Sequence, residues 1–310
     1  MASKKRNLCI GTLMTIVIGV AVFVSCKKDG NGEAEETMLA GNITIQADFS
    51  VQPIVEDALA VFQSIYPNAH ITQVNRNEAD IVQSLINDSA QVAVLTRELT
   101  EAESAHFRNK GIKARNVAFA KDGLALIGAP TATDTLINLE DVYKVMRGED
   151  ATTVKKLVFD SSRSGIAQYL MQKAGNLNKS PKNVYSLKNT AEVLIFVKNN
   201  PDAIGVVGVN WLLQPPAELE KAAKEVKVLA VSKKAKGATA KDYFKPSQTS
   251  MAEGNYPLTR TLYVVNYQGK KGLGMGFATY LTAPEGQRLI LKSGLLPVTL
   301  PSREIEIINK

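Results

Sequence analysis

The sequence LVFDSSRSGIAQYL, residues 157–170, has the pattern of a strand, a polar loop and the start of a helix near Gly165. At a helix N-terminus the first backbone N–H groups lack intrahelical partners and the helix dipole adds partial positive charge, so this turn favours anions. Hydroxyls and a guanidinium in the loop can donate to the same oxyanion. These groups belong to Ser161, Ser162, Arg163 and Ser164. Because serines are also common helix caps, this stretch alone leaves capping and ligand binding both open.

Strand-like and helix-like segments alternate along most of the chain, which predicts parallel βαβ units and an α/β fold class. Apolar runs predict strands at residues 43–45, 70–74, 91–95, 114–119, 123–127, 183–187, 203–209, 226–231 and 262–266. Helical periodicity predicts helices at residues 54–65, 78–87, 138–146, 165–173, 191–198 and 276–291. Asp122, beside Gly123 and between two of these strand runs, is predicted to lie in a turn.

The N-terminus has the layout of an export signal: Lys4, Lys5 and Arg6, then an apolar run over residues 8–24, then a small residue. The length of the run would also suit a membrane anchor helix. However, Cys26 directly after Ser25 resembles a bacterial lipoprotein signal of the Bacteroidetes type. We therefore predict a signal peptide over residues 1–25, lipidation of Cys26 and a flexible tether over residues 26–40.

Composition excludes several functional classes. Once Cys9 leaves with the signal and Cys26 carries lipid, no cysteine remains for a disulfide, a metal site or a thiol nucleophile. The two histidines, His70 and His106, are predicted to lie on the surface and outside the candidate loops, and no P-loop or dinucleotide motif is present. We therefore expect that the protein is not an enzyme and that it has no cofactor and no metal site.

The charge balance also argues against nucleic acid as a partner. Removing the three basic residues of the signal lowers the formal net charge from +7 to +4. No cluster of basic and aromatic residues accompanies this modest surplus.

Several collinear stretches together resemble the phosphate ABC-transporter substrate-binding proteins, the Pst-type members of the type 2 periplasmic binding protein superfamily. Besides the serine loop, they are ITIQADFSVQPIVEDALAVFQSIYP (43–67), VAVLTRELTEAE (92–103), FAKDGLALIGAP (119–130), NPDAIGVVGVNWL (200–212), YPLTRTLYVVNYQ (256–268) and ATYLTAPEGQRLILKSGLLPV (278–298). The resemblance implies two α/β lobes joined by a two-strand hinge, with a central ligand cleft. Lobe one would comprise residues 41–124 and 255–310, and lobe two residues 125–254.

The resemblance places the ligand contacts on three loops at strand ends, where open α/β sheets bind ligands. The implied residues are Asp48, Phe49 and Ser50 in the first loop, Thr96 and Arg97 in the second, and Ser161, Ser162, Arg163, Ser164 and Gly165 in the third. A hydroxyl residue at any one of these turns could be a cap, but three on separate loops favour a shared site. The lone tryptophan, Trp211, is expected in the core rather than in the cleft.

The site departs from the family pattern at three positions. Asp48 stands in a first loop that is usually of the G-S-x-T/S type, Asp160 replaces a usual arginine, and Ile166 replaces a threonine. Arg97 and Arg163 could supply the missing positive charge. Asp48 could accept the proton of a monohydrogen phosphate and so reject fully ionised oxyanions.

Two functions follow from these features. The first is a monomeric, lipid-anchored substrate-binding protein that captures phosphate or a related oxyanion for an ABC transporter permease. The second is a cell-envelope lipoprotein of the same fold, with an altered or lost ligand, that acts in sensing or interaction. Either would lie in the cell envelope, on the periplasmic side or at the outer-membrane surface, held to the membrane by its lipid.

Overall fold

The computed structural model describes residues 36–175, 181–234 and 236–300. The predicted signal peptide, Cys26 and the tether as far as residue 35 lie outside the described residues. Within these ranges, no helix combines the length and the apolar character that crossing a bilayer requires.

The first lobe is built on one end of a mixed sheet. Strand β1 (Gly41–Asp48) lies between β2 (Ala69–Arg76) and β3 (Val92–Leu95), parallel to both. Strand β11 (Thr259–Asn266) runs antiparallel between β3 and β4 (Arg115–Gly128). The short β12 (Leu296–Pro297) also pairs with β4. The carboxyl ends of β1 and β3 therefore open toward the same edge of the sheet.

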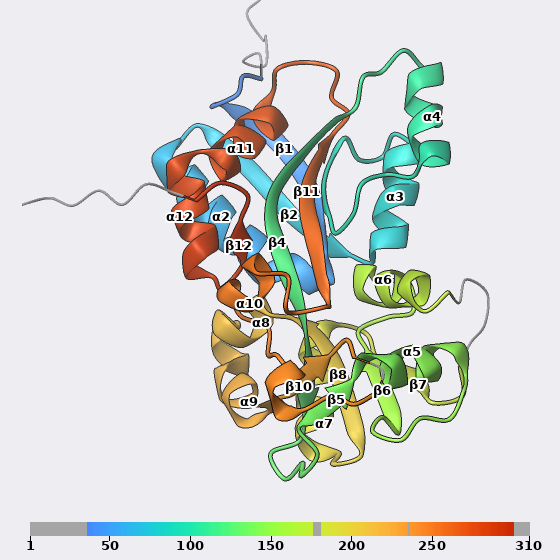
Figure 1. Cartoon of the computed structure of the whole chain (residues 1–310). Coiled ribbons are helices and arrows are strands. Elements are labelled where there is room, and N and C mark those ends of the chain that lie inside the picture. Colours follow the sequence, from blue (N-terminus) through green and yellow to red (C-terminus); the bar gives the residue numbers. More distant parts are fainter. Residues whose placement is uncertain (1–35, 176–180, 235, 301–310) are drawn as a thin grey trace, which may run out of the picture. The chain divides into compact units, whose positions relative to one another are not determined.

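Helices cover both faces of this sheet (Figure 1). On one face lie α2 (Gln52–Ile65), α11 (Leu273–Thr282) and α12 (Pro284–Lys292), whose apolar residues join β1, β2 and β11 in one buried cluster. On the other face lie α3 (Glu78–Ile86) and α4 (Glu101–Asn109), with a second cluster. Burial on both faces explains why β3 reads VAVL without alternation.

Strand β4 belongs to both lobes, because its residues 115–123 pair with β11 and its residues 124–127 pair with β8 (Ala203–Gly208). The predicted turn at Asp122 is therefore wrong: residues 121–123 continue the ladder with residues 259–261 of β11. Asp122 can stay buried there because Arg260 pairs with it. A second connection returns to β11, where the Leu124 N–H donates to the Leu258 carbonyl at 2.8 Å.

The second lobe is built on the other end of the sheet, in the order β4, β8, β6 (Lys156–Phe159) and β7 (Val184–Ser186). The predicted strand at residues 226–231 is two strands in different sheets. Strand β9 (Lys227–Val228) pairs with β4, whereas β10 (Ala230–Ser232) pairs with β5 (Leu136–Asn138). The chain changes sheets at Leu229, which is buried in the core.

Helices again lie on both faces of the second-lobe sheet. They are α5 (Leu139–Arg147), α6 (Gly165–Lys173), α7 (Thr190–Asn199), α8 (Asn210–Leu213), α9 (Glu220–Glu225) and α10 (Gln248–Ala252). One buried cluster contains residues of α5, α6 and α10, and the other contains residues of α7 and α8. Short 3₁₀ turns occupy Phe49–Val51, Ala217–Leu219 and Ala240–Asp242.

The predicted helix at residues 276–291 is also two elements. Helix α11 ends at Thr282 and α12 begins at Pro284, because the residue before a proline is disfavoured in the helical region and Ala283 is extended. The turn is tight: a Cβ on Gly286 would lie 2.2 Å from the Tyr280 carbonyl oxygen, so glycine is required.

The described end of the predicted tether is held by α11. The Glu36 carboxylate accepts hydrogen bonds from the Leu273 N–H (2.7 Å) and from Gln268 (2.8 Å), and it pairs with Lys270 at 3.0 Å. Since Gly272, the N-cap residue of α11, has no side chain, Glu36 supplies the cap.

Candidate ligand-binding site

Asp48 lies at the carboxyl end of β1, fully buried between the lobes. Its Oδ1 accepts from the Ser50 N–H at 3.0 Å and from the Ser50 hydroxyl. Its Oδ2 accepts from the Glu78 N–H at 2.9 Å and from the Gly165 N–H at 3.1 Å. Glu78 and Gly165 are the first residues of α3 and α6. Two helix N-termini, one from each lobe, therefore donate to one carboxylate oxygen.

Gly165 allows the lobes to approach this closely. A Cβ at this residue would lie 2.3 Å from the Thr96 hydroxyl oxygen and 2.9 Å from Glu78 Oε2. No side chain fits into that space without moving α6 away from the first lobe.

Thr96 and Arg97, both predicted to contact ligand, contact Glu78 in this structure, and their contact with a ligand stays a prediction. Glu78 Oε2 accepts from the Thr96 N–H (2.9 Å) and hydroxyl (2.6 Å), and Oε1 accepts from Arg97 Nε at 3.0 Å. Arg97 also pairs with Glu103 at 2.8 Å. Burial, and secondarily the charge of Asp48, raise the pKa of Glu78. These two residues therefore fix a second carboxylate beside Asp48.

The positive charge of the site comes from Arg260, near the start of β11. Arg260 Nε and Nη2 donate to Asp122 Oδ2 at 3.0 and 2.9 Å, and Nη2 also donates to the Ser50 hydroxyl at 2.7 Å. Both side chains of the ion pair are at most 1% exposed. Burial raises the pKa of Asp122 although Arg260 opposes that shift. Arg260 Nη1 has no hydrogen-bond partner among the described residues.

Asp160 lies on the second-lobe side of the site. Its Oδ1 accepts from the Ser161 N–H at 3.0 Å and its Oδ2 from the Thr190 hydroxyl at 3.1 Å. Burial, followed by the charge of Asp48, raises the pKa of Asp160 to about 7. The nearby Ser164 caps α6: its hydroxyl accepts from the Ala167 N–H and donates to the Ser161 carbonyl. Of the two roles left open for Ser164, the structure shows the helix cap. Contact of Ser164 with a ligand stays a prediction.

Asn210 and Trp211, at the start of α8, complete the site. The amide group of Asn210 is buried, and neither its oxygen nor its nitrogen has a partner among the described residues. A Cβ on Gly208 would lie 2.6 Å from Asn210 Oδ1 and 3.1 Å from Asp122 Oδ2, so this amide lies close to the Arg260–Asp122 pair. Trp211 is in the core, as predicted, and its Nε1–H donates across the lobes to the carbonyls of Phe49 (3.2 Å) and Ser50 (3.1 Å).

The remaining predicted residues are more exposed than this buried cluster. Ser162 is exposed and Phe49 is half-buried. Arg163 is also exposed, and its guanidinium donates to Asp80 of α3 at 3.1 and 2.5 Å rather than to the cluster. The third loop therefore contributes mainly the start of α6 to the site.

Sequence reasoning missed several buried polar residues, namely Glu78, Thr190, Asn210 and Arg260. Arg260 had a visible signal, because it is the one charged residue within the strand sequence TRTLYVVN. A charge in an apolar strand requires a buried partner. The others had no comparable signal, since they begin helices, where polar residues are common.

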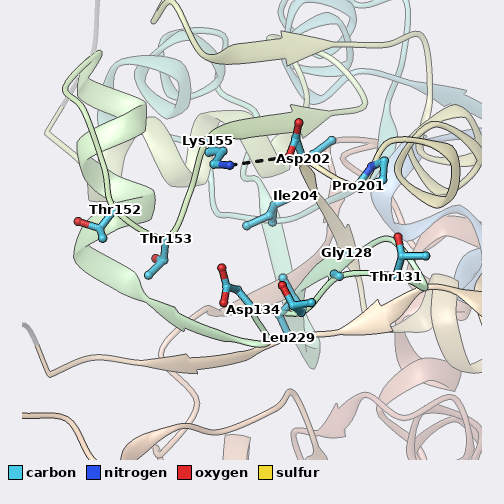
Figure 2. A pocket seen from close by; sticks show the side chains of 13 residues that line it. Gly128, Thr131, Asp134, Thr152, Thr153, Lys155, Pro201, Asp202, Ile204 and Leu229 are labelled. Atoms are coloured by element: carbon cyan, nitrogen blue, oxygen red, sulfur yellow. Dashed lines mark ion pairs between the residues drawn. The ribbon is translucent and has the colours of Figure 1, made fainter.

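A cavity of about 200 Å³ lies at the end of the second-lobe strands that is farther from this buried cluster (Figure 2). It is lined by the end of β4 and the start of β8, with threonines and the ion pair between Lys155 and Asp202 at 3.9 Å. Both charged side chains are largely exposed. We therefore assign the candidate site to the buried groups between the lobes.

Comparison with known proteins agrees with this architecture. The model of the PBP superfamily domain matches residues 32–285. The chain belongs to this superfamily. The superfamily and the two-lobed fold predicted from the sequence are thereby confirmed.

Several similar proteins have names that refer to phosphate binding or phosphate transport. The phosphate-binding protein PstS of Borreliella burgdorferi is 21% identical over 304 residues, which cover 92% of this chain and 98% of that protein. A putative phosphate ABC transporter substrate-binding protein from Clostridium perfringens, solved with bound phosphate, has a TM-score of 0.66 at 16% identity, covering 84% of this chain and all of that chain. An ABC-type phosphate transport receptor from Vibrio cholerae has a TM-score of 0.59 at 18% identity, covering 83% and 100%.

The described residues also bear on metal binding. Across residues 36–175, 181–234 and 236–300, no three histidine, cysteine or carboxylate side chains are placed to hold a metal ion. His70 is exposed, as predicted, whereas His106 is half-buried against Phe107.

Proposed function

We propose that this protein is the substrate-binding component of an ABC transporter and binds phosphate or a related oxyanion between its two lobes. The observation that carries the proposal is the buried guanidinium of Arg260, which donates to the Ser50 hydroxyl. Ser50 in turn donates to the Asp48 carboxylate, which accepts from the α3 and α6 N-termini. Buried cations and helix N-termini both favour oxyanions. The names of the relatives support phosphate as the ligand.

The groups that would bind the anion are those with free donor capacity. Arg260 Nη1 and the Asn210 amide are buried without partners among the described residues, and such groups cost free energy until they are satisfied. The Ser50 hydroxyl and the first N–H groups of α3 and α6 donate to Asp48 in this structure, and they would add donors once Asp48 releases them.

The buried carboxylates would select the protonation state of the ligand. Monohydrogen phosphate carries a proton that a carboxylate can accept, whereas sulfate carries none at neutral pH. One of the four buried acids would accept that proton. We propose binding without catalysis, because no histidine lies among the described residues of the site to act as a base.

We further propose that Cys26 carries the lipid that holds the protein to the membrane, on the periplasmic side or at the outer-membrane surface. The partner would be an ABC transporter permease, and the protein would act as a monomer. The proposed lobes would follow the predicted boundaries, residues 41–124 with 255–310 and residues 125–254.

One observation favours the second function, an envelope lipoprotein with an altered or lost ligand. The site holds four buried acids, Asp48, Glu78, Asp122 and Asp160, and only one buried arginine. Four carboxylates are an unusual lining for an anion site, because like charges repel when desolvated.

Thermal unfolding of the dialysed full chain in phosphate, sulfate and chloride at matched ionic strength tests the proposal. A ligand at 100 times its dissociation constant stabilises by about 2.7 kcal/mol, which is several degrees at this size. We expect a shift with phosphate that the double variant Ser50→Ala, Ser164→Ala loses. Ser104→Ala on α4 is the matched control and should keep the shift. Equal melting temperatures in all three salts would favour the second function.

A further inference from the structure

Asp48 already makes the contacts that an anion would make at this site. Its carboxylate accepts from Gly165 of the second lobe and from Glu78 and Ser50 of the first, and all of these atoms are buried. We propose that Asp48 is an internal anion that holds the lobes closed before ligand binds, so that an oxyanion must displace its carboxylate to reach the α3 and α6 amides. The displacement half of this proposal rests on the proposed function, whereas the closing half does not.

Asp48 and Arg163 both make charged contacts between the lobes, and these contacts differ in burial. Arg163 also donates across the lobes, to Asp80, but the two side chains are 58% and 38% exposed, and exposed ion pairs contribute little. The Asp48 carboxylate is 0% exposed and accepts charge-assisted hydrogen bonds, which are roughly twice as strong as neutral ones. The closed arrangement therefore depends mainly on Asp48 among the charged groups between the lobes.

Charge explains why an oxyanion would displace Asp48 rather than bind beside it. The acids around Asp48 are Glu78 of α3, Asp122 of β4 and Asp160 after β6, and the cations are Arg260 of β11 and the half-buried Arg97. Arg97 is already shared by two carboxylates. A second anion beside an ionised Asp48 would add like charge in a desolvated site.

Displacement has a measurable cost in affinity. When only a fraction of the molecules is competent to bind, the apparent dissociation constant rises by the inverse of that fraction. If Asp48 keeps about nine-tenths of the molecules closed, removing its charge should tighten anion binding about tenfold. If instead Asp48 accepts a proton from bound phosphate, removing its charge should weaken binding.

Trp211 gives a direct measure of closure, because it is the only tryptophan in the sequence and its Nε1–H donates to lobe-one carbonyls from lobe two. In the dialysed wild-type full chain we expect Trp211 to be shielded from acrylamide, with the same radius of gyration by X-ray scattering with and without phosphate. An exposed Trp211 and a radius that shrinks on adding phosphate would overturn the proposal without any variant.

The variant Asp48→Asn keeps the shape of the side chain and removes its charge. We expect its tryptophan emission to shift to the red and its acrylamide quenching to increase in the absence of anion. Asp141→Asn is the matched control, because Asp141 is also a buried acid but its hydrogen bonds, from Thr153, stay within the second lobe and outside the site. It should leave the Trp211 signal unchanged. An Asp48→Asn protein whose Trp211 stays as shielded as in the wild type would overturn the proposal.

Titration with phosphate tests separately whether Asp48 holds the lobes closed and whether an oxyanion displaces it. Reclosure of Asp48→Asn by phosphate, with about tenfold tighter binding than the wild type, would support both halves. An open variant that ignores phosphate would support Asp48 as the internal anion and contradict phosphate as the ligand. An open variant that binds phosphate more weakly than the wild type would overturn displacement and identify Asp48 as a direct contact of the ligand.

Discussion

At the scale of single residues, the most consequential contact of the site is the buried ion pair between Arg260 and Asp122. Neither side chain is more than 1% exposed, and Asp122 Oδ2 receives two hydrogen bonds from the guanidinium. Removing one partner of a buried pair leaves the other charge desolvated and unpaired, which costs more than the intact pair contributes. Arg260 therefore has both a structural and a binding role.

This role predicts a large loss of stability for Arg260→Met. The variant leaves Asp122 buried without its counter-charge, and we expect a loss of about 3–5 kcal/mol in urea unfolding. The double variant Arg260→Met, Asp122→Leu should recover much of that loss, because no charge then remains unpaired. A single variant as stable as the wild type would contradict the assignment of this pair as fully desolvated.

The raised pKa of Asp160 predicts that its contribution to folding stability depends on pH. Its pKa is raised to about 7 in the folded protein from 3.8, mainly by burial, so the folded state holds the proton more tightly than the unfolded state. The contribution of Asp160 to stability therefore falls as pH rises from about 4 to about 7 and is constant above that. The total change is at most about 4 kcal/mol.

Asp160→Asn should remove this slope. We expect the variant to gain stability relative to the wild type as pH rises from 4 to 7, measured by urea unfolding at each pH. Asp202→Asn, at a largely exposed acid of the same lobe, is the control and should run parallel to the wild type. A constant difference between Asp160→Asn and wild type across this range would show that Asp160 titrates normally.

At the scale of elements, the start of α6 decides how close the lobes can come. Gly165→Ala places a Cβ where the Thr96 hydroxyl lies at 2.3 Å, so α6 must move outward and the Gly165 N–H loses Asp48. We expect greater acrylamide quenching of Trp211 and phosphate affinity reduced by tenfold or more. Gln172→Ala, on an exposed position of the same helix, should change neither. Unchanged quenching in Gly165→Ala would contradict the close approach.

Helix α11 depends on a residue from before the first strand. Glu36 caps it through the Leu273 N–H, and hydrogen bonds from Gln268 and Lys270, together with that N–H, outweigh burial and lower the pKa of Glu36. Its contribution is therefore present above the ordinary carboxyl pKa and is lost as pH falls through the lowered value. Glu36→Gln should cost about 1 kcal/mol at pH 7 in urea unfolding. Glu98→Gln, at an exposed position, is the control, and equal losses in both would contradict the cap.

The sequence predicted most elements because local patterns determine them, and the errors have local explanations. Residues 276–291 read as one helix since their periodicity continues across Pro284, but proline restricts the residue before it. Asp122 and Gly123 read as a turn because both are common in turns. The buried Arg260 reverses that preference, and its position is set by the partner strand rather than by the local sequence.

At the scale of the whole molecule, the site is made by contacts between distant segments. Arg260 donates to Ser50 across 210 positions, and Gly165 donates to Asp48 across 117. The sequence predicted which loops meet, because parallel strands bring their carboxyl ends together. It could not predict that the Asp48 carboxylate would accept hydrogen bonds from both helix N-termini, because that contact depends on how closely the lobes approach.

The proposed function requires that the site between the lobes takes up one phosphate. Equilibrium dialysis of the exhaustively dialysed full chain against radiolabelled phosphate, with and without an equal concentration of sulfate, measures this uptake directly. We expect saturable binding of one phosphate per chain that sulfate does not displace, because sulfate brings no proton for the buried acids. The absence of saturable binding, or equal displacement by sulfate, would contradict it.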